Sequence, residues 1–273
     1  MKKIFTISIM LIISAVLFTG CLEVNTTIHL NKDGSGTLEE SVLMSSEVLQ
    51  MISAFASSFD STKADSNKFS LFKEDELRAD TSKYGSGIKY ITGKEIKENG
   101  KEGYRAIYSF SDINKLQINQ NPNSKIEMEG VEFEKDTSNE FLNFSFVPGT
   151  TSRLTIKSPL NSDKDVSNEE VPTNDTASAD FKGMDEFLKL MKDMHISLKL
   201  DINGKITETT ASYVEGSEIT LFDINFNGLF DNPEKLKKFK TENPRNIEEI
   251  KEIMKDIPGI KVELNNEVNV TFE

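Results

Sequence analysis

The sequence predicts an α+β protein in which amphipathic helices pack on a mainly antiparallel, curved sheet. Runs of alternating apolar and polar residues recur along the chain, and the short turns between them favour antiparallel pairing. Two segments, residues 47–59 and 184–194, instead carry apolar residues at spacings of three and four, which is typical of helices that pack one face on a core. The first 20 residues have the composition of a removable export signal.

This N-terminal signal is predicted from charge, length and small residues. Two lysines at positions 2 and 3 precede a nearly uninterrupted apolar run of 15 residues, Ile4 to Phe18. A helix that crosses a membrane needs about 20 apolar residues, so this run has the length of a secretory signal instead. Small residues follow, directly before Cys21, the only cysteine. We therefore expect residues 1–20 to be a cleaved signal peptide and residues 21–273 to form the mature protein.

A hairpin is predicted directly after Cys21. Residues 23–30 alternate in period two with apolar side chains on one face, residues 31–36 form a turn, and residues 37–44 return. We interpret Gly34 and Gly36 as turn residues with positive φ.

The same turn resembles the start of a calcium-binding EF-hand loop. Position 12 of that loop would be Val42, where a calcium site needs a bidentate Glu, and strands flank the turn where an EF-hand has helices. We therefore expect no metal here. The four matching residues are Asn31, Asp33, Ser35 and Gly36.

The middle of the chain begins with the helix of residues 47–59, for which Ser45 is the expected N-cap. Its apolar stripe predicts packing on the core. Further segments are a weak helix at residues 71–79, a hairpin of residues 88–96 and 104–110 joined by residues 97–103, and strands at residues 125–134, 140–147 and 152–158.

An acidic stretch, residues 161–180, then interrupts the pattern and predicts a flexible loop or linker. After it, the helix of residues 184–194 has an apolar face of mixed Met, Phe and Leu. Such a face is either core packing or an adaptable surface for an apolar ligand, because Met side chains repack readily. The residues of this possible ligand face are Met184, Phe187, Leu188 and Met191.

Strands return in the last part of the chain. Residues 196–202 alternate, and Asn203-Gly204 predicts a hairpin whose second strand begins at Lys205. The remaining segments are a turn at residues 213–216, a strand at 217–222, a helix from Pro233 capped by Asp231 or Asn232, a helix between Asn243-Pro244 and Pro258-Gly259, and residues 260–272 as one bent strand or as a hairpin turning at 265–266. We expect one unit over residues 21–273, with residues 231–273 as an alternative C-terminal subdomain.

Charge and cysteine content exclude several classes of protein. The formal net charge is −13, from 45 acidic and 32 basic residues, which disfavours nucleic-acid binding. A polybasic attachment to anionic lipids is likewise not expected. A single cysteine rules out an intramolecular disulfide and a cysteine-rich metal site.

Catalytic motifs are also missing from the sequence, which contains no Gly-x-Ser-x-Gly, no His-Glu-x-x-His and no phosphate-binding loop. Ser70-x-x-Lys73 and Ser86-x-x-Lys89 match the start of a penicillin-binding signature but lack its partner motifs. We interpret His29 as a residue of the polar strand face and His195 as the end of a helix. We expect neither an enzyme nor a bound cofactor or metal.

Several of these motifs together resemble the LppM-type bacterial lipoproteins. They are Cys21 after its signal, the turn Asn31-Lys32-Asp33-Gly34-Ser35-Gly36-Thr37, the stretch Asn203-Gly204-Lys205-Ile206-Thr207, and Val214-Glu215-Gly216-Ser217-Glu218-Ile219-Thr220-Leu221. The sequence departs from the family pattern at Asn203, where Pro is common, at Leu221, where an aromatic residue is common, and in having no C-terminal membrane span.

The resemblance implies an exported α+β module of the bacterial envelope. Signal cleavage would occur before Cys21, which would become diacylated and N-acylated, palmitate being a typical chain. This would anchor the protein to the outer membrane or to the outer face of the cytoplasmic membrane. We expect a non-catalytic binding or interaction module whose partner is an envelope component. The alternatives are a carrier that binds lipid or glycolipid in an apolar pocket and, third, a hydrolase.

Overall fold

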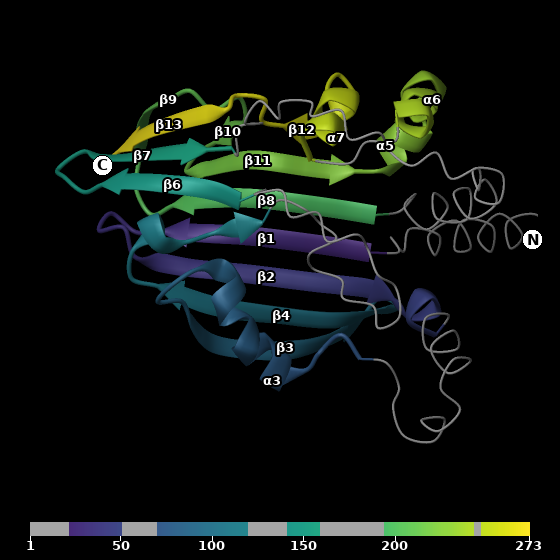
Figure 1. The fold of residues 1–273 in the computed structure, drawn as a ribbon, viewed down its shortest axis with the longest axis horizontal. Coiled ribbons are helices and arrows are strands. Elements are labelled where there is room, and N and C mark those ends of the chain that lie inside the picture. Colours follow the sequence, from purple (N-terminus) through teal and green to yellow (C-terminus); the bar gives the residue numbers. More distant parts are fainter. Residues whose placement is uncertain (1–21, 51–69, 120–140, 159–193, 243–246) are drawn as a thin grey trace, which may run out of the picture.

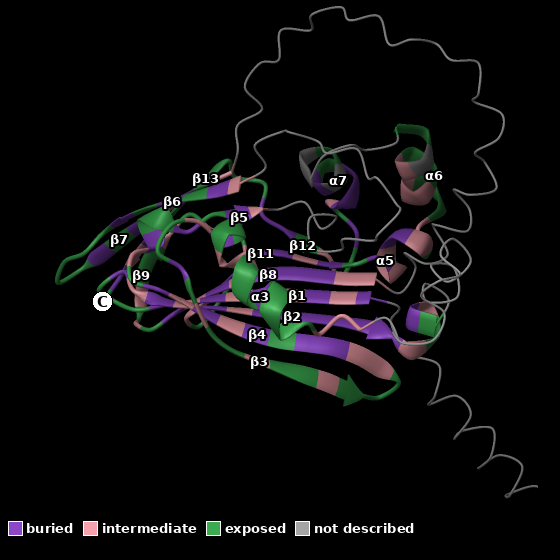
Figure 2. Cartoon of the chain, turned by 60° about the horizontal axis from the view of Figure 1, so that its bottom comes forward, coloured by how far each residue is buried: buried purple, intermediate pink, exposed green. Residues whose placement is uncertain are grey.

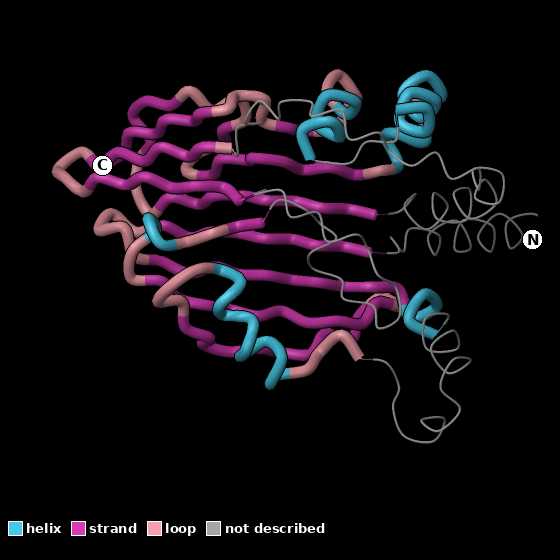
Figure 3. Tube along the Cα trace, viewed as in Figure 1, coloured by secondary structure: helices cyan, strands magenta, loops and turns pink. Residues whose placement is uncertain are grey.

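The structure is a computed structural model that describes residues 22–50, 70–119, 141–158, 194–242 and 247–273. Within these ranges strands predominate and helices are few (Figure 3). The fold is therefore a mixed α+β class with sheets rich in antiparallel pairs.

The strands form two sheets, where the sequence predicted one (Figure 1). The first has eight strands in the order β10-β11-β8-β1-β2-β4-β3, with β12 also paired to β11, and the second has the order β5-β6-β7-β13-β9. The strands of the first sheet are β1 (Leu22–Leu30), β2 (Gly36–Ser45), β3 (Lys89–Glu98), β4 (Lys101–Phe110), β8 (Met194–Ile202), β10 (Val214–Glu215), β11 (Glu218–Asn225) and β12 (Lys261–Val262). Those of the second are β5 (Ile118–Asn119), β6 (Phe141–Val147), β7 (Ser152–Lys157), β9 (Ile206–Thr209) and β13 (Glu267–Phe272).

Strands from before and after the acidic stretch share both sheets. β1 pairs in parallel with β8, with Val24 opposite Ile196 and Ile28 opposite Leu200. β13 pairs with β7 in the second sheet. Because directly opposite residues face the same side, the apolar rows of β1 and β8 coincide and form one continuous inner face.

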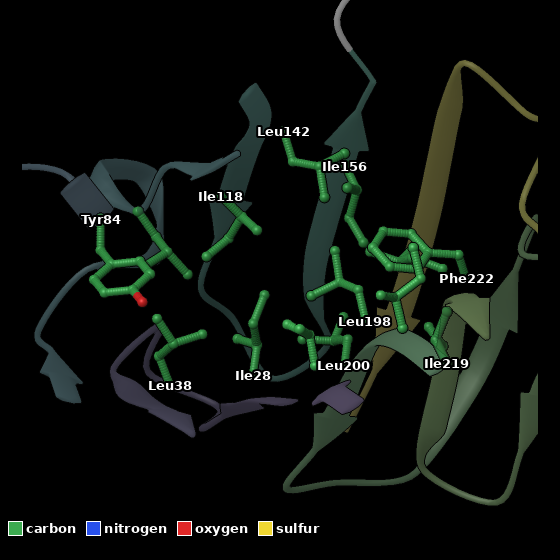
Figure 4. Close-up of a cluster of buried hydrophobic side chains, with 14 of the residues drawn as sticks. Ile28, Leu38, Tyr84, Ile118, Leu142, Ile156, Leu198, Leu200, Ile219 and Phe222 are labelled. Atoms are coloured by element: carbon green, nitrogen blue, oxygen red, sulfur yellow. The ribbon is translucent and has the colours of Figure 1, made fainter. Parts of the chain in front are cut away.

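The core lies between this inner face and the second sheet. Figure 4 shows Ile28, Leu38 and Leu200 of the first sheet on one side, with Leu142 and Ile156 of the second sheet opposite them. Figure 2 shows that the second sheet and the described helices lie on this side of the first sheet. On the other face of the first sheet, here called the outer face, β1 and β8 carry polar side chains, among them His29, Ser197 and Asp201.

The described helices are short. They are α3 (Glu74–Ala79), η2 (Asp80–Tyr84), η3 (Ile113–Lys115), α5 (Asn227–Phe230), α6 (Pro233–Glu242) and α7 (Ile247–Met254). Asn232 caps α6, as one of the two expected caps, because its Oδ1 accepts a hydrogen bond from the backbone N of Lys235 at 3.2 Å. In the part of the chain that the structure describes, no helix has the length and apolarity needed to cross a bilayer.

Two predicted helices are only partly within the described residues. Of residues 47–59, those up to residue 50 are helical, and Ser45 Oγ accepts from the backbone N of Val48 at 3.3 Å as the expected cap. The helix of residues 184–194 was predicted one residue too long, because Met194 is the first residue of β8. His195 therefore lies in a strand and does not end a helix, while residues 184–193 lie outside the described ranges.

The predicted hairpin at Asn203-Gly204 is wrong. β8 and β9 do not pair, since the chain crosses there from the first sheet to the second. Lys205 and Glu273 exchange backbone hydrogen bonds of 2.8 and 3.0 Å, so the strand that follows the turn is held by the C-terminus. Residues 260–272 make a second crossing in the same direction, with β12 in the first sheet and β13 in the second, and form neither a bent strand nor a hairpin.

Two turns differ in detail from the prediction. The β3–β4 hairpin turns on Asn99 and Gly100 alone, both with positive φ, so its strands run into the predicted loop of residues 97–103. Gly34 has the expected positive φ of 86°. Gly36 does not, and it is needed for another reason: a Cβ there would lie 2.0 Å from the carbonyl O of His29.

The strand of residues 125–134 and the acidic loop of residues 161–180 lie outside the described ranges.

Candidate binding site

A shallow depression of about 460 Å³, open to solvent, lies where β1 and β8 end. Polar side chains from three separate parts of the chain line it. Leu22, where the chain enters the fold, is at the other end of β1, about 26 Å away at 3.3 Å per residue. The lining residues are His29, Asn31, Asp201, Ile202, Asn203, Gly204 and Ser217.

Sheet register brings the central groups together. His29 stands directly opposite Asp201 in the parallel pair β1–β8, on the polar outer face. Asp201 Oδ2 lies 3.2 Å from His29 Nδ1, and the Ser217 hydroxyl donates to Asp201 Oδ1 at 2.9 Å. Since a carboxylate can only accept, His29 carries its proton on Nδ1 in the neutral form and its Nε2 is left as an acceptor.

Amide side chains fix the rim of the depression. Asn203 Nδ2 donates to Asn31 Oδ1 at 3.1 Å, and Asn31 Nδ2 donates to Ser35 Oγ at 3.1 Å. The chain of bonds ends on Asp33, which accepts from the side chain and the backbone N of Ser35. These two bonds lower the pKa of Asp33. Asp33 thus closes its own turn, in agreement with our interpretation of this loop as a turn.

The depression presents mainly hydrogen-bond acceptors. Asp201 supplies a carboxylate, His29 in its neutral form supplies Nε2 as an acceptor, and Asn203 supplies a carbonyl oxygen, since its amide nitrogen bonds to Asn31. Lys32 brings a cation to the rim, with its Cε beside Gly204. Such a surface is complementary to a ligand rich in donors, which means hydroxyl or ammonium groups.

The hydrogen bonds among Ser217, Asp201 and His29 do not suit nucleophilic catalysis. A serine nucleophile must donate its proton to a histidine that a carboxylate orients. Here the Asp201 carboxylate lies between the other two groups, and Ser217 donates to it instead of to His29.

A second cluster of titratable groups is buried under η2. Glu40, only 2% exposed, accepts hydrogen bonds from the hydroxyls of Tyr84 at 2.7 Å and Tyr104 at 2.8 Å. The Tyr108 ring packs 4.8 Å from that of Tyr84. Burial, and then the Glu40 charge, raise the pKa of all three tyrosines, so their hydroxyls stay protonated. With Tyr90 beside Tyr108, the cluster holds four of the five tyrosines of the chain.

This tyrosine cluster links three elements. Through Glu40 it fastens the α3–η2 segment to β2 and β4. Within the described ranges, no three His, Cys, Asp or Glu side chains meet in a way that could hold a metal ion.

No family model matches the chain, and no curated protein matches it. One solved structure does. The NMR structure of the Mycobacterium tuberculosis LppM folded domain matches 75% of this chain and 82% of its own length, with 11% sequence identity and a TM-score of 0.31. This is a distant likeness to an LppM domain, and it establishes neither family membership nor an activity.

The site residues predicted from the sequence are mostly not among the described residues. Cys21 and the four residues of the possible ligand face, Met184, Phe187, Leu188 and Met191, are outside the described ranges. Ser70 and Lys73 do not pair with each other, because Ser70 Oγ donates to the carbonyl of Phe72 and Lys73 bonds to Glu76.

The depression was not predicted from the sequence. Period two placed His29 on the polar face, and Asn203-Gly204 marked a turn, but no local pattern links positions 29, 201 and 217. Their meeting depends on the parallel pairing of β1 with β8.

Proposed function

We propose that this protein is a non-catalytic binding module of the bacterial envelope. It is exported, anchored to a membrane through a lipidated Cys21, and recognises a donor-rich envelope component in the depression around Asp201. The observation that carries the proposal is the acceptor-lined, solvent-open depression at the end of β1 away from Leu22. The anchor follows from the signal before Cys21 and holds that depression away from the attachment point.

A matched pair of variants tests the binding site. His195 and Asp223 form a pair of the same chemistry at the opposite end of β8, with Nε2 of His195 2.7 Å from Oδ1 of Asp223. Asp201→Asn should abolish ligand binding, while Asp223→Asn should leave it unchanged. ¹⁵N-labelled mature protein titrated with glucosamine and with N-acetylglucosamine gives the readout and separates recognition of an ammonium group from recognition of hydroxyl groups.

The expected result is a shift of the His29 and Asn203 amide signals with at least one of the two sugars, lost in Asp201→Asn. If neither sugar moves these signals, or if both variants respond alike, the depression is not a recognition site for such groups and the proposal is wrong.

The anchor has its own test. Mass spectrometry of the native protein should find Cys21 acylated at its N-terminus and on its sulfur, and Cys21→Ala protein should leave the membrane fraction. An unmodified Cys21, or Cys21→Ala protein that still sediments with membranes, would contradict the lipid anchor. Neither result would bear on the proposed binding site.

A lipid or glycolipid carrier is the second candidate. It would bind an acyl chain between the sheet and the face of Met184, Phe187, Leu188 and Met191, because Met side chains can repack around ligands of different shape. Lipid that co-purifies with Cys21→Ala protein and is lost from folded Met191→Trp protein would support a carrier. A protein free of lipid in both cases would exclude it.

A further inference from the structure

β3 leaves one long edge of the first sheet unpaired within the described residues. It is a strand of ten residues, and β4 is its only neighbour in the sheet order (Figure 2). On such an edge, every second residue directs its backbone N–H and C=O away from the sheet, where they can pair with another strand. A bulge at Ile91 disturbs the first part of β3, but the part from Thr92 to Glu98 pairs regularly with β4.

The charges of this regular part are complementary to those of a second copy that runs antiparallel to it. Residues 94–98 read Lys-Glu-Ile-Lys-Glu. In an antiparallel pair of two copies with Ile96 on the twofold axis, Lys94 stands opposite the partner's Glu98, and Glu95 opposite the partner's Lys97. Each charge then faces the opposite charge, and the two Ile96 side chains meet at the centre.

Neighbouring registers lack this complementarity. Centring the pair on Glu95 places two glutamates opposite each other, and centring it on Lys94 places two lysines opposite each other, both of which are destabilising. A twofold axis perpendicular to the sheet allows only registers in which a residue faces its own copy, so Ile96 is the favoured centre of this segment.

In the isolated chain Lys97 pairs with Glu95 at 2.9 Å, and the two outer charges, Lys94 and Glu98, are the ones left without a partner among the described residues. Lys94 stands opposite Arg105 of β4, a like charge, and Arg105 is paired with Glu39 at 3.2 Å. Neither Lys94 nor Glu98 has an ion pair among the described residues. Ile96 faces Gly103, which offers no side chain to cover it. An open depression of about 320 Å³ runs along the edge here, lined by residues 94–98 and Arg105.

We propose that a second copy of this chain occupies the β3 edge, in an antiparallel β3–β3 pair centred on Ile96. Five to seven residue pairs bury less than the roughly 1,200–2,000 Å² of a stable interface, so the dimer is weak in dilute solution. Confinement of two copies to one membrane surface would raise their effective concentration and favour the pair.

Charge exchange tests the register. Lys94→Glu and Glu98→Lys each place like charges opposite each other at both ends of the pair, and each should weaken dimerisation about tenfold in sedimentation equilibrium. The double variant Lys94→Glu/Glu98→Lys restores opposite charges and should recover the wild-type dissociation constant. Additive weakening in the double variant, or wild-type protein that is monomeric at millimolar concentration, would overturn the proposal.

A cysteine at the centre gives a second readout that does not depend on affinity. In Ile96→Cys protein the introduced thiol would face its own copy within disulfide reach, whereas the thiol of Thr92→Cys protein would face the partner's Gly100. Mild oxidation should therefore cross-link Ile96→Cys protein and leave Thr92→Cys and wild-type protein, with Cys21 alone, as monomers. Equal cross-linking of the two variants would show random collision and contradict the register.

Discussion

At the scale of single residues, Glu40 is a buried carboxylate within the described core. Its carboxylate is the acceptor for two buried hydroxyls, those of Tyr84 and Tyr104. Glu40→Leu would leave both hydroxyls buried without this acceptor, at an expected cost of about 2–5 kcal/mol in the free energy of unfolding, measured with urea. Its neighbour Glu39 makes a partly exposed ion pair with Arg105, so Glu39→Gln should cost at most about 1 kcal/mol. Equal losses in the two variants would contradict a structural role for Glu40.

Asp223 gives a prediction for the effect of pH. Its hydrogen bond with His195 is the main cause that lowers the pKa of Asp223 in the folded protein. A lowered pKa stabilises the fold above the ordinary Asp pKa of about 3.9, and this stabilisation is lost as pH falls through the folded-state value. Asp223→Asn should therefore be less stable than wild type at pH 7, by a difference that disappears toward pH 2. Urea midpoints across this range measure it, and a difference that grows in acid would contradict the assignment.

At the scale of elements, the β1–β2 hairpin depends on Gly36 through close approach of two backbones. A Cβ at Gly36 would lie 2.0 Å from the His29 carbonyl and force the strands apart beside the depression. Gly87 has a positive φ of 81° with nothing near its Cβ position, so Gly87→Ala should cost only the strain of that conformation, about 1–2 kcal/mol. We expect Gly36→Ala to lower the free energy of unfolding clearly more than Gly87→Ala. If thermal or urea unfolding showed a larger loss of stability for Gly87→Ala than for Gly36→Ala, the hairpin would be able to accommodate the extra methyl group with little loss of free energy.

At the scale of the whole molecule, both sheets join strands from the two sides of residues 161–180. β1 pairs with β8, and β7 with β13. Limited proteolysis should cut residues 161–180 first, and the two fragments should then co-elute on gel filtration, because each sheet would lose a central neighbour on separation. We also expect one cooperative unfolding transition. Fragments that separate and remain folded would instead indicate two independent domains.

Residues 231–273 illustrate the same coupling. β12 pairs with β11 of the first sheet, and β13 lies between β7 and β9 of the second. The strands of this segment thus have their partners outside it. We expect a chain shortened before residue 231 to lose the cooperative unfolding of the remainder.

Local chemistry in the sequence determined the strand faces, caps and several turns. Period two placed His29 on the polar face, Asn232 was one of two expected caps, and Gly34 has the positive φ expected of it. These features depend on neighbours within a few residues, so a single sequence contains them. The sequence also contains the charges of residues 94–98 that suit antiparallel pairing of two copies. Their role can be inferred only once β3 is known to be an edge strand.

Only the tertiary structure decided which strands meet. Asn203-Gly204 is a strong local turn signal, yet the strand after it pairs with the C-terminal strand, because Lys205 finds its backbone partner in Glu273. Likewise, the alternation of β2 places Glu40 on the inner face. No nearby sequence pattern predicts that Tyr84 and Tyr104 donate hydrogen bonds to it. Pairing between distant strands depends on the burial of whole strand faces and on backbone N–H and C=O groups, which every residue type except proline carries in full. The candidate site at Asp201 arises from such a choice, which is why the sequence alone did not reveal it.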